Sequence, residues 1–210
     1  KKIGAGVAAK VMARAKTDGM GSSNNQSLTA GMIDHARSLG MVNPWISQES
    51  PARPPMLPNY GAVKTWNFDR NRLESIRPPM PYLEGSAEFK KDMDELKNIQ
   101  KNQSRKQAAI ANYWADGPGS YTPPGHWHRY AASAGVDAEF NEIRMARLFA
   151  YVGTALMDAG IACWDTKYFY YSPRPQQFGL KTSVGLPNFP SYTSGHSTFS
   201  FAAATVLSAF

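Results

Sequence analysis

The sequence predicts an all-α protein, a helical bundle with long proline-rich loops. Apolar residues recur at steps of three and four in two long segments, as on one face of a helix. No segment alternates apolar and polar residues with a period of two. Eight of the fifteen prolines lie within residues 41–82 and exclude long helices there. A hydrophobic content of 42% over 210 residues is ample for a buried core.

The N-terminal region, residues 1–82, is predicted to contain a short helix followed by a wrapping segment. The helix ends at Gly19, a residue type that favours helix C-termini. Its apolar face consists of Val7, Val11 and Ala15. Residues 41–82 are predicted to be an ordered loop, because their aromatic side chains give the loop something to bury. These side chains are Trp45, Trp66 and Phe68.

The second region, residues 83–210, is predicted to be the helical-bundle domain. Ser86 is a good N-cap for a long amphipathic helix, and after a break Asp137 is predicted to cap a central helix. The apolar stripe of this central helix is broad, as expected inside a bundle, and consists of Phe140, Ile143, Leu148, Val152, Ala155, Leu156 and Ala159. Residues 165–193 are predicted to form a loop, and a last helix starts near Ser194.

Composition and charge exclude several classes of partner. The formal net charge is +7, but the basic residues are scattered and no aromatic stacking pattern accompanies them, which argues against nucleic acid. A positive field does favour anionic substrates or cofactors. The sequence contains no run of eighteen apolar residues, so it predicts no membrane span. The single cysteine, Cys163, excludes an internal disulfide.

One segment rich in aromatics and prolines brings cations, a hydroxyl, a glycine and a histidine together. Lys167 and Arg174, taken alone, are as easily explained as two surface cations in a loop. The Ser194, Gly195 and His196 triplet changes that interpretation, because it stands at the start of an apolar helix. Free backbone N–H groups and the helix dipole attract anions there. The segment therefore predicts a site for a tetrahedral oxyanion, with His196 as an acid–base group.

His126 and His128 are two further candidate metal ligands. They lie two residues apart, but two ligands without a nearby acidic or thiol partner rarely make a site. We therefore expect both histidines to have a structural role in a loop.

The site residues resemble the first two signature blocks of a superfamily. It joins vanadium-dependent haloperoxidases, bacterial acid phosphatases and type-2 phosphatidic acid phosphatases. The matching residues are Lys167, Arg174 and Pro175, then Ser194, Gly195 and His196. The similarity is closest to vanadium chloroperoxidases, which also have a tryptophan three residues before the site lysine, here Trp164. A phenylalanine seven residues before the histidine, here Phe189, is shared too, and the resemblance runs over about residues 113–201.

The resemblance implies a role for each residue. The equatorial oxygens of vanadate as cofactor, or of phosphate as substrate or analogue, would be held by Lys167, Arg174, Ser194 and the Gly195 N–H. His196 would bond an axial oxygen and move its proton, and Lys167 would assist. Trp164 and Phe189 would form an apolar wall near the halide, although plain core packing explains them equally well in a phosphatase. Asp116 would support the site by pairing with a further arginine.

The third signature block of the superfamily is absent. That block carries an arginine and a histidine that bonds vanadium or attacks phosphorus, and no arginine or histidine follows His196. We therefore expect no direct side-chain ligand of the metal in this chain. A missing C-terminal segment or a second chain would complete the site. The resemblance also implies a secreted or periplasmic location and is compatible with an oligomer.

The sequence leaves three functions open. The first is a haloperoxidase that oxidises halide with hydrogen peroxide at bound vanadate, which Trp164 and Phe189 favour. The second is an acid phosphatase that hydrolyses phosphate esters in the same pocket, with His196 protonating the leaving group. The third is a non-catalytic anion-binding fragment or subunit that needs a second polypeptide, and the missing block supports it.

Overall fold

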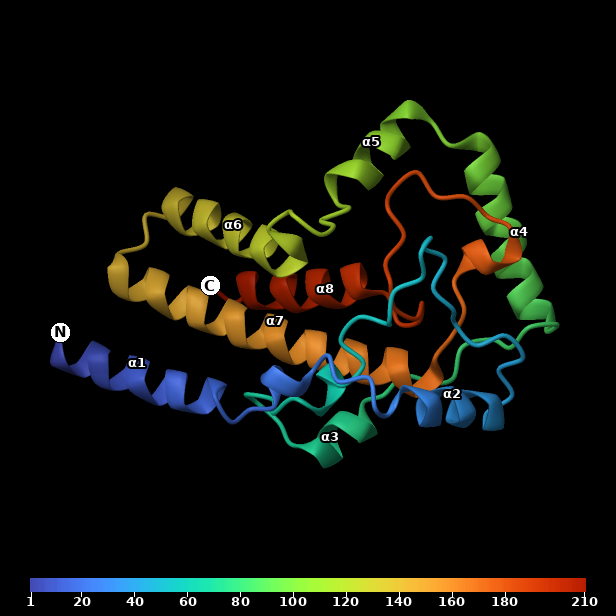
Figure 1. Cartoon of the computed structure of the whole chain (residues 1–210). Helices are drawn as coiled ribbons and strands as arrows, with labels where there is room; N and C mark the ends of the chain where they lie inside the picture. The colour runs from blue at the N-terminus through green and yellow to red at the C-terminus, as the bar shows by residue number, and fades with distance from the viewer.

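The computed structural model describes residues 1–210 and is all-helical, as predicted, with 59% of residues in helices and no strand (Figure 1). The α-helices are α1 Lys2–Ala15, α2 Thr29–Ser38, α3 Arg70–Ser75, α4 Ala87–Asn102, α5 Arg105–Tyr113, α6 Thr122–Asp137, α7 Glu142–Tyr170 and α8 Gly195–Leu207. Short 3-10 turns lie between them at Met20–Ser22, Tyr60–Ala62 and Pro175–Phe178.

The 29-residue helix α7 is the central element of the fold. In Figure 1 it runs through the middle of the molecule, with α6 and α8 beside it on one side and the N-terminal segments on the other. By length and composition alone, α7 is long and apolar enough to cross a membrane. The core helix of a helical bundle meets the same two criteria. Its C-terminal half is the more buried half, and that half carries the predicted site lysine.

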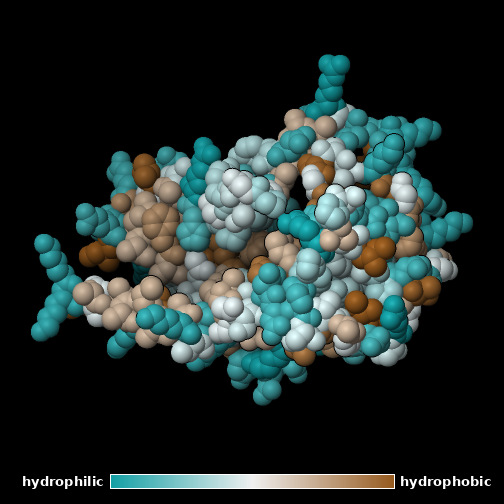
Figure 2. Space-filling model, viewed as in Figure 1, coloured by the Kyte–Doolittle hydropathy of each residue, from teal (hydrophilic) through white to brown (hydrophobic).

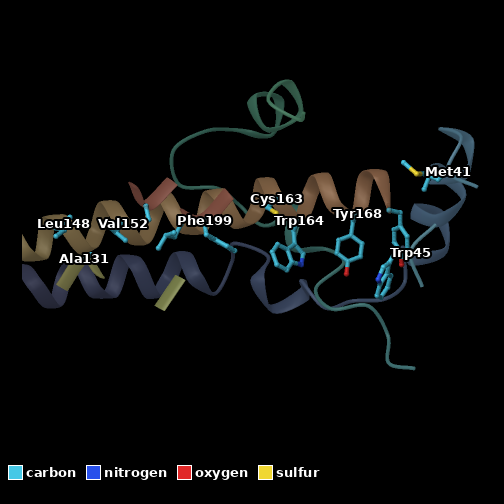
Figure 3. Close-up of a cluster of buried hydrophobic side chains, with 13 residues drawn as sticks. Met41, Trp45, Ala131, Leu148, Val152, Cys163, Trp164, Tyr168 and Phe199 are labelled. Atoms are coloured by element: carbon cyan, nitrogen blue, oxygen red, sulfur yellow. The ribbon is translucent and has the colours of Figure 1, made fainter. Parts of the chain in front are cut away.

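One cluster of 13 buried residues forms the main hydrophobic core (Figure 3). The contribution of α7 consists of Leu148, Val152, Leu156, Cys163, Trp164 and Tyr168. Phe199 of α8 packs against this row, and Met41 and Trp45 of the N-terminal region join its other end. Both predicted regions therefore contribute to one core, while the division between them at residue 82 remains a prediction.

The start and end of the central helix differ from the prediction. Asn141 caps α7, because its side chain accepts the N–H of Arg144 at 3.0 Å, whereas Asp137 is the last residue of α6. Asn and Asp cap equally well, so the turn of the chain decides between them. At the other end α7 continues to Tyr170, and Lys167 therefore lies on a helix rather than in the predicted loop.

The predicted long helix after Ser86 is two helices, α4 and α5. Ser104 ends the first by capping the second: its hydroxyl accepts the Gln107 N–H, and the Gln107 side chain accepts the Ser104 N–H. The expected loop around His126 and His128 is also wrong, because α6 already begins at Thr122. Two prolines occupy the first turn of α6. Backbone N–H groups in a first turn have no acceptor within the helix, so the prolines cost no hydrogen bond there.

The proline-rich segment 41–82 is ordered along α7, as predicted. Asp158, buried on α7, accepts the backbone N–H groups of Trp66 at 2.7 Å and Asn67 at 2.9 Å. Trp45 is buried, but the Trp66 side chain is 38% exposed. Its indole lies beneath the guanidinium of Arg14 at the surface rather than in the core, with 4.0 Å between the guanidinium carbon and the ring.

Several large apolar side chains stay exposed. The face in Figure 2 mixes hydrophilic side chains with hydrophobic ones. Val7 and Val11, the predicted apolar face of α1, are both exposed, and so is Ile143 of the predicted stripe on α7. Gly19, with φ of 95°, begins the following 3-10 turn instead of ending α1. Periodicity therefore identifies these helices without indicating which faces are covered.

Gly61 lets the wrapping segment touch α7 directly. A Cβ at this position would lie 2.5 Å from the Cα of Asp165 and 2.8 Å from its backbone nitrogen. Both atoms belong to the backbone of a core helix, so no side-chain rotation can relieve the overlap.

Changing Gly61 to Ala should therefore lower the free energy of unfolding by about 3 kcal/mol. Gly6 is the matched control, since a Cβ there meets nothing within 4 Å in exposed α1. Gly6→Ala should instead raise stability by about 0.5–1 kcal/mol. Urea unfolding followed by circular dichroism measures both changes. Equal effects of the two substitutions would show that the contact with Asp165 is not tight.

Candidate functional site

Lys167 is the most deeply buried cation of the predicted site. It lies near the C-terminal end of α7 and is only 1% exposed. Its ammonium nitrogen donates to the backbone carbonyls of Pro190 at 3.1 Å, Ser191 at 2.6 Å and Thr193 at 2.5 Å. An ammonium has three N–H donors, and all three are used. The segment before α8 is therefore bound to α7 through this one side chain.

Arg174 reaches the same segment from the other side of the turn that follows α7. Its Nε donates to the Phe189 carbonyl at 2.8 Å, and its Nη2 contacts the Pro190 carbonyl at 3.4 Å. Lys167 bonds the same Pro190 oxygen. The structure thus brings the two predicted cations together at one carbonyl, although six residues separate them in the sequence.

Backbone geometry explains how this turn closes. Tyr171 ends α7 in the left-handed conformation, with φ of 50°. Ser172 then pairs with the returning chain: its carbonyl accepts the Ser191 N–H at 3.0 Å, and its hydroxyl accepts the Tyr192 N–H at 2.9 Å. The loop that separates the two signature blocks is therefore closed at its base, which puts residues 189–193 against Lys167.

Burial makes the charged forms of both side chains less favourable. It lowers the pKa of Lys167 to about 8, an effect that the Cys163 thiol opposes and the charge of Arg174 reinforces. Burial also lowers the pKa of Arg174 to about 10. Neither side chain forms an ion pair with a carboxylate. A buried cation next to a half-buried one, without a counter-charge, is costly unless an anion joins them.

Ser194, Gly195 and His196 begin α8, as predicted. Ser194 is the N-cap, and its hydroxyl oxygen accepts the Ser197 N–H at 3.2 Å. The first N–H groups of α8 therefore follow directly after the turn that Lys167 holds through Thr193. His196 is exposed and its ring also contacts another segment: its Nε2 lies 2.5 Å from the carbonyl of Trp114.

Trp164 and Phe189 lie beside the cations. Their ring centroids are 4.8 Å apart, and Trp164 is part of the hydrophobic core. The Lys167 nitrogen is 5.1 Å and the Arg174 guanidinium carbon 4.9 Å from the centroid of the Phe189 ring. The half-buried Phe189 ring thus borders both cations with its apolar surface.

Asp116 has a different partner from the arginine that we expected. Its carboxylate oxygen Oδ2 lies 2.9 Å from Nδ1 of His126, and both side chains are almost fully buried. His128 bonds instead to the Pro124 carbonyl one turn earlier in α6. No group of three or more His, Cys, Asp or Glu side chains is arranged to hold a metal ion.

An ion-pair cluster next to the site was missed by the sequence analysis. Asp165, two residues before Lys167 on α7, is bound by Arg70 at 2.9 Å and by Arg77 at 2.8 Å. These arginines stand about ninety residues earlier, in the proline-rich segment, and no spacing pattern links them to α7. The sequence offers no signal for this pairing, because Asp165 falls in the segment 165–193 that was predicted to be a loop, where an acidic side chain needs no partner.

The donor set suits an oxyanion in its chemistry. Two cations bond carbonyls in the turn 189–193, the first N–H groups of α8 follow directly after this turn, and the Ser194 hydroxyl can still donate its hydrogen. The arrangement also imposes a condition, because Lys167 has no unused donor. An anion must replace at least one of the three carbonyls that Lys167 now binds.

Comparison with known proteins supplies one informative match. No family model and no curated protein matches the sequence. Among solved structures, the chain is similar to a crystal structure described as the first bacterial vanadium-dependent iodoperoxidase, with a TM-score of 0.70 and 25% sequence identity. The match covers 84% of this chain and 48% of that chain, so this chain spans about half the length of the structure it matches.

The fold comparison and the motif lead to the same superfamily. The matched protein depends on vanadium, and the likeness extends over most of the helices described above. The two blocks that suggested the resemblance lie at the end of α7 and the start of α8, where their cations meet. The fold of the chain therefore supports the superfamily of vanadium haloperoxidases and type-2 phosphatidic acid phosphatases that the motif suggested.

Proposed function

We propose that this chain forms the oxyanion-binding part of a vanadium-dependent haloperoxidase, which oxidises halide with hydrogen peroxide. One observation carries the proposal: Lys167 and Arg174 share the carbonyl of Pro190, in the turn just before α8, and have no carboxylate partner. Two adjacent positive charges of this kind, one buried and one half-buried, favour a bound anion of matching charge. The similarity to an iodoperoxidase adds support for vanadate as that anion.

Each residue of the site would act on the oxyanion in a distinct way. Lys167 and Arg174 would neutralise its charge in a water-poor environment, where such interactions are strongest. The Ser194 hydroxyl and the Gly195 N–H would orient its oxygens without adding charge. When bound, vanadate would supply the centre at which peroxide is activated toward halide. His196 would give a proton to, or take one from, an oxygen at the edge of the site.

Phe189 and Trp164 favour halide as the substrate. A halide is a weakly hydrated anion, and an aromatic wall next to two cations offers it an apolar surface and a positive potential. A phosphate ester would use the cations but has no need of the wall. We further propose hydrogen peroxide as the oxidant and a secreted or periplasmic location, in keeping with the superfamily resemblance.

Changing Arg174 to Ala should weaken binding of orthovanadate by roughly 1.5–3 kcal/mol, because a charge-assisted donor is lost. Equilibrium dialysis of wild type and variant measures the difference. Arg129, an exposed arginine of α6 without an ion pair, is the matched control, and Arg129→Ala should leave the affinity unchanged. Equal affinity of Arg174→Ala and wild type would remove Arg174 from the site.

Sulfate is a probe whose charge does not change between pH 6 and pH 10, so it isolates the contribution of Lys167. An anion binds the charged ammonium, and the pKa of Lys167 without ligand is about 8. Affinity should therefore be constant below pH 8 and fall by up to about tenfold per unit above it. Calorimetric titration over this range measures the step. Lys167→Met should abolish it, and exposed Lys181→Met should not. A flat profile in wild type would contradict the proposed role of Lys167.

The activity itself is tested with the natural full-length protein loaded with orthovanadate. We expect it to oxidise iodide or bromide with peroxide, and His196→Ala to lower kcat by about 100- to 10,000-fold through loss of the proton transfer. His35→Ala, on α2, is the control and should keep full activity. Turnover of phosphate esters without halide oxidation would instead identify a phosphatase.

A further inference from the structure

His196 has a single protein partner, the carbonyl of Trp114. The Nε2 to oxygen distance is 2.5 Å, and 82 residues separate the two groups in the sequence. In Figure 1 the segment between α5 and α6 passes beside the N-terminal end of α8, as this contact requires. Trp114 follows the last residue of α5, where helix carbonyls lack an intrahelical partner and are free to accept a side-chain donor.

This hydrogen bond determines which ring nitrogen of His196 carries the proton. A carbonyl oxygen can only accept, so Nε2 must carry the hydrogen. In the neutral imidazole, Nδ1 then has the free lone pair. The position of the Trp114 carbonyl therefore fixes both the orientation of the ring and the nitrogen that remains for proton exchange.

Trp114 is in turn held by a buried histidine. The His126 ring, 1% exposed, stacks on the Trp114 indole with 4.7 Å between centroids and an interplanar angle of 28°. The Tyr130 ring stacks on both of these rings, with centroid distances of 5.1 Å to His126 and 5.9 Å to Trp114. The indole is thus part of a packed aromatic group, and its backbone cannot shift without disturbing that group.

Asp116, two residues after Trp114, binds the same histidine. Its Oδ2 lies 2.9 Å from His126 Nδ1, and its backbone adopts the left-handed region with φ of 44°. An aspartate tolerates this conformation better than most residues, but at some cost. The second nitrogen of His126 faces the Tyr113 hydroxyl at 3.4 Å. His126 therefore has both ring nitrogens engaged and holds residues 114 and 116 at once.

We propose that His126 and Asp116 are positioning residues that hold the Trp114 carbonyl in place, and through it the ring of His196. His126 does not touch the oxyanion itself, because its ring is buried and both nitrogens have partners. This role goes beyond the general packing function expected of His126 from the sequence. The value of the arrangement for proton transfer rests on the proposed function, whereas the placement of His196 does not.

Nuclear magnetic resonance of the ¹⁵N-labelled chain tests this placement directly. The Nε2–H resonance of His196, assigned by its loss in His196→Gln, should be visible and protected from exchange with water. In His126→Phe, which keeps a ring but removes the bond to Asp116, exchange should be about tenfold faster or more, equivalent to about 1.4 kcal/mol of lost protection. His128→Phe, on the same helix and without contact to Trp114, should leave the resonance unchanged.

A pair of substitutions at Asp116 guards against misfolding of the histidine variant. Asp116→Ala removes the acceptor and should expose the His196 Nε2–H, whereas Asp116→Asn keeps an oxygen acceptor and should preserve its protection. An unchanged resonance in folded His126→Phe and Asp116→Ala would overturn the proposal, and so would an equal loss in His128→Phe. Sulfate titration separates the two claims: failure to bind sulfate with the resonance pattern intact would reject the proposed function alone.

Discussion

The bond between one buried ammonium and one turn of the backbone organises this molecule. Lys167 donates to three carbonyls, those of Pro190, Ser191 and Thr193, and these bonds bring the start of α8 to the end of α7. Burying an ammonium is costly, and the lowered pKa of Lys167 reflects that cost. The carbonyls offset part of it by supplying partial negative charge. They cannot supply a full negative charge, which is why a second cation, Arg174, makes the site suited to an anion.

The rest of the fold serves to keep this turn in place. Ser172 closes the loop at its base through two hydrogen bonds, and the proline-rich segment reaches the site through Met56, whose carbonyl accepts the Tyr168 hydroxyl at 2.6 Å. On the opposite flank, the turn between α5 and α6 accepts His196. Segments from three distant parts of the sequence thus meet at one helix N-terminus. The proline-rich region has little regular structure. It is ordered by contacts to the rigid helix α7, such as those of Asp158 and Tyr168, and by contacts to neighbouring loops, such as the bond from the Met56 N–H to the Asn188 carbonyl.

Local sequence patterns predicted which helices exist better than they predicted where those helices begin and end. The all-α class followed from periodicity, and the start of α8 followed from Ser194 before an apolar run. The break at Ser104 and the cap at Asn141 were missed, because several equivalent capping residues lie near each boundary and packing chooses among them. At the site, the motif predicted that Lys167 and Arg174 would meet. It could not predict that both would bind carbonyls, or that Asp116 would pair with His126, because these contacts depend on how the turns close in space.

The central claim is that the turn held by Lys167 is an anion site whose carbonyls yield to the ligand. A crystal structure of the protein grown with orthovanadate, with anomalous data collected at the vanadium edge, tests it most directly. The account predicts an anomalous peak within hydrogen-bonding distance of Lys167, Arg174 and the Gly195 N–H, with at least one Lys167 carbonyl bond exchanged for the anion. A structure in which Lys167 keeps all three carbonyls and vanadium binds elsewhere, or not at all, would contradict it.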